Sequence, residues 1–301
     1  MRISNNTMVE RTMRDINANK ARMAATQNDI STGKRIHRGA DDPTGAARAQ
    51  VLRQKMAANE TYETNVDAST DFLKSTDEAM TQLHDVMLRI RTLAIQGSSG
   101  NLQQSEKAVL AGEVDQLREV VRTIGNTQDG TERYVFGGLK TNVEPFPGID
   151  VTLGPNDVGT MQVEVAQGSM MTYNVTGVSV FGDTTPPNDT HLFQTLDELS
   201  SLLRAGSNTT EISDISLAKI DEHLESLNAI RTDVGSRVER LDLAKTRYED
   251  LKLSLDAMLD DTEGTDIVTA SLRLNQYESA FQASLSVGAR ALPLSLVDFL
   301  R

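Results

Sequence analysis

The sequence predicts a mainly α-helical protein with a small β insert: an elongated antiparallel helical bundle or coiled-coil rod made from both chain ends, plus a small central β-rich domain. Apolar residues recur at helical spacing over most of both halves, whereas strand-like alternation is confined to the middle. The composition favours a thin helical body over a compact globule, because only 38% of residues are hydrophobic, only 4% are aromatic, and Trp is absent.

A weakly amphipathic helix is expected from about residue 4 to residue 31. Lys20 and Gln27 interrupt its apolar face, so the seam is thin and typical of a helix that needs a partner. The apolar residues follow a three-four spacing: Val9, Met13, Ile16, Met23 and Ile30.

The next stretch, 27–47, reads as a turn between two helices. Gly33 can supply a left-handed C-cap, with the cations of 34–35 favouring the end of a helix. Asp41, Asp42 and Pro43 then predict an N-cap followed by proline near the first helical position. The chain therefore opens as a helix, a short ordered turn and a long helix.

The long helix is predicted over 44–95 and a further helix over 103–125. In the long helix apolar residues hold a seven-residue spacing, which predicts a coiled-coil-like partner. Those residues are Val66, Leu73, Met80, Met87 and Ala94, with Leu83 and Ile90 between them. The further helix has an apolar stripe of Leu110, Val114, Leu117, Val121 and Ile124.

A β insert is expected within 131–187, where Gly, Pro, Asn, Thr and Val dominate. Alternation over 161–165 and again over 171–175, on either side of Gln167 and Gly168, predicts a hairpin. The segments 151–153 and 178–181 are weaker strand candidates.

Helices return over 191–205 and 214–259, and 260–265 is expected to interrupt the second of these. Thr265 and Asp266 can cap a last helix, which carries the apolar residues Ile267, Ala270, Leu274, Tyr277 and Phe281. Pro293 disfavours a continuous helix to residue 301.

The sequence offers no catalytic, cofactor-binding or metal site, and an enzyme is not expected. Cysteine is absent, no two histidines have the spacing of a zinc helix, and no phosphate-binding glycine loop or nucleophile elbow occurs. Asp221-Glu222-His223 is better explained as a solvated helix face than as a metal corner. A net charge of −13 disfavours nucleic acid and anionic membranes as partners. No segment has the apolar length of a signal peptide or a membrane span.

The apolar stripes at the two chain ends are predicted to form an assembly interface. Because these seams are poorly covered in one subunit, 1–31 and 276–301 are expected to be mobile until neighbouring subunits supply partner helices. The alternative is that both ends pack together within a monomer. The interface residues expected are Ile3, Val9, Met13, Ile16, Met23, Ile30, Leu274, Tyr277, Phe281, Leu292 and Leu296.

Five segments follow from these patterns. They are an N-terminal assembly helix (1–35), the first half of a helical rod (36–135), a β-rich insert (136–190), the second half of the rod (191–264) and a C-terminal assembly helix (265–301).

Several of these residues resemble the flagellin superfamily. Ile30-Ser31-Thr32-Gly33-Lys34-Arg35, followed by Asp41-Asp42-Pro43 and Ala46-Ala47, resembles its N-terminal signature, and Val234-Gly235-Ser236-Arg237 with Asp260-Asp261 agrees at the other end. Within the superfamily the chain resembles the hook–filament junction branch, that of hook-associated protein 3 (FlgL). The residues that carry this are Met1-Arg2-Ile3-Ser4, Asn126-Thr127, Gly130, Tyr134-Val135-Phe136-Gly137-Gly138, Pro145-Phe146 and Ser295-Leu296-Val297-Asp298-Phe299-Leu300. A basic turn, His37-Arg38-Gly39-Ala40, departs from the pattern.

The resemblance implies a secreted structural adaptor of the bacterial flagellum, exported without a cleaved signal peptide through the flagellar type III apparatus. It implies four partners: a FlgK-like junction protein, flagellin, further copies of the chain in a helical or ring assembly, and a FlgN-like export chaperone. It also implies an insert that projects outward. Flagellin itself is an alternative, and an outward-facing binding module built on 151–181 is another.

Overall fold

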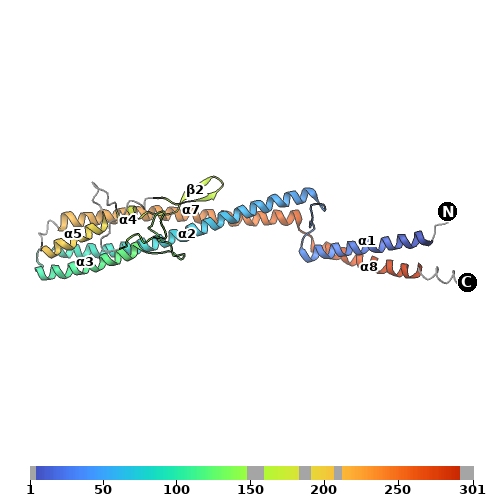
Figure 1. Cartoon of the computed structure of the whole chain (residues 1–301), viewed down its shortest axis with the longest axis horizontal. Coiled ribbons are helices and arrows are strands. Elements are labelled where there is room, and N and C mark those ends of the chain that lie inside the picture. The colour runs from blue at the N-terminus through green and yellow to red at the C-terminus, as the bar shows by residue number, and fades with distance from the viewer. Residues whose placement is uncertain (1–4, 148–158, 183–190, 207–211, 292–301) are drawn as a thin grey trace. The chain divides into compact units, whose positions relative to one another are not determined.

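A computed structural model describes residues 5–147, 159–182, 191–206 and 212–291 (Figure 1). The elements in chain order are α1 (Asn5–Thr32), α2 (Pro43–Gly97), α3 (Gln104–Gly125), β1 (Gln162–Ala166), β2 (Ser169–Thr172), α4 (Gly177–Phe181), α5 (Leu192–Ala205), a π-helical turn (Ile212–Leu217), α7 (Ala218–Glu263) and α8 (Ile267–Ala291). The mainly α fold with a small β insert is confirmed. The chain forms two compact units: unit 1 is 1–58 with 251–301, and unit 2 is 59–250.

Unit 2 is a bundle whose core follows the predicted seven-residue pattern. Every residue of that pattern in α2 is buried, with exposed fractions of at most 1%. Ion pairs join Asp67 to Lys245 and Asp77 to Arg231, so α2 and α7 run antiparallel. Two further long-range pairs, Arg118–Asp197 and Asp115–Arg204, place α3 and α5 antiparallel as well.

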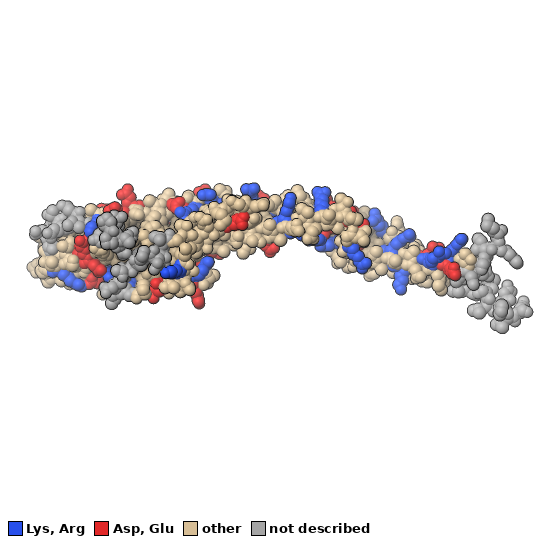
Figure 2. All heavy atoms as spheres, turned by 45° about the horizontal axis from the view of Figure 1, so that its top comes forward, with Lys and Arg blue, Asp and Glu red and all other residues tan. Residues whose placement is uncertain are grey.

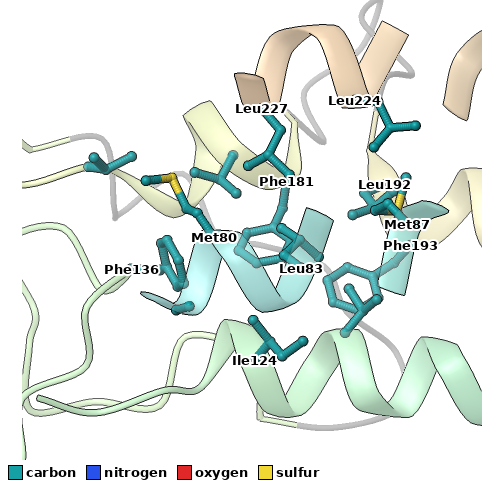
Figure 3. Packing of buried hydrophobic residues seen from close by; sticks show 14 of the residues in the cluster. Met80, Leu83, Met87, Ile124, Phe136, Phe181, Leu192, Phe193, Leu224 and Leu227 are labelled. Carbon is teal, nitrogen blue, oxygen red and sulfur yellow. The ribbon is translucent and has the colours of Figure 1, made fainter. Parts of the chain in front are cut away.

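The core of unit 2 contains a cluster of four phenylalanine rings. Phe136, Phe146, Phe181 and Phe193 are buried, and each ring has at least one neighbour in the set with its centroid 4.8–5.9 Å away. Figure 3 shows side chains from α2, α3, α4, α5 and α7 pointing toward one another around the rings of Phe136, Phe181 and Phe193. A few large aromatic side chains, gathered at one place, thus add to the packing that the long helices provide.

The segment after α3 is held by the residues that carried the more specific resemblance. The side-chain amide of Asn126 donates to the Phe146 carbonyl (3.0 Å), and its Oδ1 accepts from the Phe146 N–H (2.9 Å). The Val135 N–H donates to the Thr127 carbonyl (3.0 Å). These bonds bring Phe136 and Phe146 back onto the end of α3, so this stretch has a structural role.

The predicted hairpin is confirmed. β1 and β2 pair antiparallel with Val163 opposite Met171, and Gly168 takes a positive φ of +73° in the turn between them. The hairpin is fastened to the bundle from β1: the Asn65 amide donates to the Glu164 carbonyl (3.2 Å), and the Tyr248 hydroxyl donates to the Val165 carbonyl.

Two sequence-based expectations are wrong. Residues 178–181 belong to helix α4, because the Thr176 hydroxyl accepts from the Ser179 N–H (3.3 Å) as a cap and Phe181 enters the aromatic cluster. The expected interruption at 260–265 is shorter, since α7 continues to Glu263 and only the residues 264–266 separate it from α8. The strand candidate at 151–153 lies outside the described residues.

Unit 1 joins the two chain ends. α1 packs against α8, and the Asn19 amide donates to the Ser284 hydroxyl (3.1 Å). Ile16 and Thr12 lie beside Gly288, so the two helices run antiparallel, as Figure 1 shows. Within the described residues, no helix combines the length and apolarity needed to cross a membrane.

Candidate assembly interface

The turn between α1 and α2 is built by the residues in which the sequence showed helix signals. Gly33 has a φ of +68° just after α1, and Pro43 is the first residue of α2. The Gly45 N–H donates to Asp42 Oδ1 (2.9 Å), and the N–H groups of His37 and Arg38 donate to Asp41 Oδ2 (3.1 and 2.8 Å). Both aspartates therefore satisfy backbone donors that a helix start or tight turn would leave unpaired.

These bonds also set the electrostatics of the turn. The N–H groups of Arg38 and His37 hold the pKa of Asp41 below its ordinary value, and the N–H of Gly45 does the same for the pKa of Asp42. Both carboxylates are thus ionised wherever the protein is folded near neutral pH.

The predicted interface residues of the described chain ends line the seam between α1 and α8. Ile16, Met23, Ile30, Leu274, Tyr277 and Phe281 are half-buried there. Met13 differs, because 58% of it is exposed. The sequence also allowed an alternative, in which the two chain ends pack against each other within one chain. The structure shows that packing, which leaves these seam residues only half-buried.

Other predicted residues cannot be placed. Ile3, Leu292, Pro293 and Leu296 lie outside the described residues, and Val9 falls in α1 without a described side chain.

Sequence reasoning missed most of the exposed apolar side chains of α8. Val268, Leu272, Leu285 and Val287 are 46–70% exposed, and Ile267, which the sequence placed on the apolar face of this helix, is 57% exposed. Unit 1 contains 10 of the 18 large apolar side chains that are exposed among the described residues, although it holds only 109 of the 301 residues. The sequence contained this signal: apolar residues occur on more than one side of α8, which a helix with a single buried face does not need.

Many of the described ionisable residues of unit 2 form ion pairs within the bundle. Asp221, once considered for a metal corner, pairs with Arg91 (2.5 Å), and burial lowers the pKa of the neighbouring His223. His191 stacks on Phe193 (5.4 Å). Among the described residues no group of His, Asp and Glu could hold a metal ion. Acidic and basic side chains both occur along the face shown in Figure 2.

Comparison with known proteins agrees with this architecture. The bacterial flagellin N-terminal helical region matches residues 3–141, and the bacterial flagellin C-terminal helical region matches residues 217–300. Flagellar hook-associated protein 3 of Escherichia coli K12 is 24% identical over 98% of both chains, and that of Salmonella typhimurium LT2 is 26% identical over 94% of this chain and 95% of the relative.

Solved structures show the same fold. The crystal structure of flagellar hook-associated protein 3 from Legionella pneumophila superposes with a TM-score of 0.63 at 15% identity, covering 70% of this chain and 98% of that one. The two matched helical regions together cover most of the sequence, including all of α1, α2, α3, α7 and α8. The chain belongs to the bacterial flagellin family.

Proposed function

We propose that the chain is a structural adaptor subunit of the bacterial flagellum, which joins a hook-proximal junction protein to the flagellin filament. The observation that carries the proposal is the exposed apolar surface of unit 1, on the helices that correspond to the family's terminal regions. Such a surface needs a partner helix, and head-to-tail contacts between copies give a helical or ring assembly. Similarity to hook-associated protein 3 over nearly the whole chain supports the junction role.

The proposal includes the partners and the route that the resemblance implied. The partners are a FlgK-like junction protein, flagellin, further copies of the chain and a FlgN-like export chaperone. The chain is exported without a cleaved signal peptide and works outside the cell. Segments 1–35 and 265–301 act in assembly, and Ile3, Leu292 and Leu296 contribute beyond the described seam. The insert faces outward.

Deleting the gene tests the role, with electron microscopy of the cells and an immunoblot of the medium for flagellin. Bare hooks with flagellin shed into the medium are expected, because subunits would be exported without a place to attach. Normal filaments would overturn the proposal.

The same experiment distinguishes the junction role from the second candidate function, flagellin itself, which the family assignment alone also allows. Bare hooks with no flagellin in cells or medium would identify this chain as the filament subunit.

A further inference from the structure

The two connectors of unit 1 lie side by side although more than 200 residues separate them in the chain. One joins α1 to α2 and the other joins α7 to α8. The Arg35 N–H donates to the Glu263 carbonyl (2.7 Å), and the Thr265 N–H donates to the Gly33 carbonyl (2.9 Å). Lys34 and Gly264 complete a short antiparallel bridge.

A single carboxylate reinforces this bridge. The side chain of Glu263 is only 4% exposed, and its Oε1 lies 2.7 Å from Lys34 Nζ, while its Oε2 pairs with Arg53. The Arg35 guanidinium adds a bond to the Thr262 carbonyl (2.7 Å). The last turn of α7 is thereby tied both to the first connector and to α2.

We propose that Glu263 is a positioning residue that couples the two connectors, so that α1 and α8 pair in one arrangement and are released together. Each connector alone is short and glycine-containing, with Gly33 and Gly39 in one and Gly264 in the other. We call Glu263 and its two ion pairs, with Lys34 and Arg53, the clasp. Without the clasp each terminal helix could move on its own connector. With it, a movement at one connector requires breaking an ion pair and backbone bonds that belong to the other.

The charges around Glu263 favour this coupling. Burial alone would raise the pKa of Glu263, but Lys34 and Arg53 outweigh burial and leave that pKa below its ordinary value. Glu263 is buried, whereas the Lys34 and Arg53 side chains are 46% and 45% exposed. Removing the carboxylate charge would leave these two cations on either side of a buried group that no longer neutralises them.

The absence of cysteine makes a direct test possible. Cysteines replacing Asn19 and Ser284, whose side chains touch across α1 and α8, can be joined by a short bis-maleimide, and no other thiol competes. In the full chain carrying this pair, E263Q is expected to slow cross-linking about three- to tenfold. The matched control is D256N, which removes one negative charge from an exposed position of α7 in the same unit. It is expected to leave the rate unchanged.

The cations give a second and independent set of variants. K34A and R53A should each slow cross-linking, whereas K55A and R48A, at exposed positions of the same unit, should not. Adding K34A to E263Q should slow cross-linking only a little further, because both substitutions remove the same ion pair. Hydrogen exchange over 72–94 in unit 2 shows whether a variant has folded. Equal cross-linking rates for E263Q and D256N in folded protein would overturn the coupling.

One consequence of the coupling rests on the proposed function: E263Q should weaken attachment to the filament in cells. Cross-linking is measured in the isolated chain, so the two ideas fail separately. If E263Q slows cross-linking but cells carrying it have normal filaments, the coupling by Glu263 is supported, and the paired arrangement of α1 and α8 is not needed for attachment.

Discussion

Asp129 organises the turn that follows α3. Its Oδ1 accepts from the N–H groups of Thr131 (2.8 Å) and Arg133 (2.9 Å), and its Oδ2 accepts from the Arg133 guanidinium (2.9 and 2.7 Å). Between them Glu132 takes a left-handed φ of +63°, a conformation that a non-glycine residue adopts only when its surroundings hold it. The turn therefore depends on one carboxylate.

That dependence predicts how stability changes with pH. Burial would raise the pKa of Asp129, but the bonds from Arg133 and Thr131 outweigh it and leave the pKa below its ordinary value. As the pH falls below about 4, the unfolded state takes up a proton first, so stability is lost progressively until the folded pKa is passed. D129N should cost about 1–3 kcal/mol at pH 7. It should also flatten the pH dependence of urea unfolding between pH 6 and pH 3, and an unchanged slope would contradict this account.

Two glycines of α3 predict opposite effects of the same substitution. A Cβ on Gly125 would lie 2.6 Å from the ring of Phe146, whereas a Cβ on Gly112 would meet nothing within 4 Å. G125A should therefore destabilise the protein by about 1–3 kcal/mol through overpacking. G112A should stabilise it by about 0.4–1 kcal/mol, because alanine favours the helix. Thermal unfolding of the two variants checks both, and a stable G125A would show that the aromatic cluster is looser than its geometry indicates.

Helices were predictable where one periodic pattern was sustained, as in α2, whose seven-residue repeat is buried throughout. Short elements were not. Residues 178–181 alternate like a strand, yet the Thr176 cap and the burial of Phe181 among other rings make them a helix. The end of α7 was misplaced for a related reason. Its acidic run looks like a turn, but Thr262 bonds back to the Met258 carbonyl (2.7 Å) and the Glu263 charge is neutralised by distant cations.

The two faces of α8 predict separable effects. V268D and L272D change side chains that are 70% and 59% exposed, so each should alter the unfolding free energy by less than about 0.5 kcal/mol. Both should nevertheless reduce attachment to hooks or filaments, because a charge would enter the apolar contact with a neighbouring subunit.

The inner face gives the contrasting variant. Phe281 is half-buried in the seam between α1 and α8, so F281D should loosen that pairing in the isolated chain before any assembly occurs. Cross-linking across the seam measures this loosening, and sedimentation with preformed filaments measures attachment. If V268D and L272D attach normally, the exposed side of α8 that carries Val268 and Leu272 takes no part in assembly.

Contacts between residues far apart in the chain could not be predicted from the sequence. Gly33, Asp41, Asp42 and Pro43 were visible as local helix signals because their bonds are made within the turn. The clasp at Glu263 was not, because its partners Lys34 and Arg53 lie more than 200 residues away in the chain and a glutamate in an acidic run at a helix end looks like a surface charge.

The uneven charge of the chain leads to a final prediction. Unit 2 holds 31 acidic and 15 basic residues, whereas unit 1 holds 12 acidic and 15 basic. Copies brought together through unit 1 would carry mutually repelling unit 2 bodies, and salt screens repulsion between exposed charges over about 10 Å at 0.1 M. Self-association measured by sedimentation should therefore strengthen between about 20 and 300 mM NaCl. Replacing the exposed Asp71 and Glu78 of unit 2 by their amides should strengthen it at low salt and reduce the salt dependence. Association that weakens as salt rises would show instead that ion pairs between copies dominate the contact.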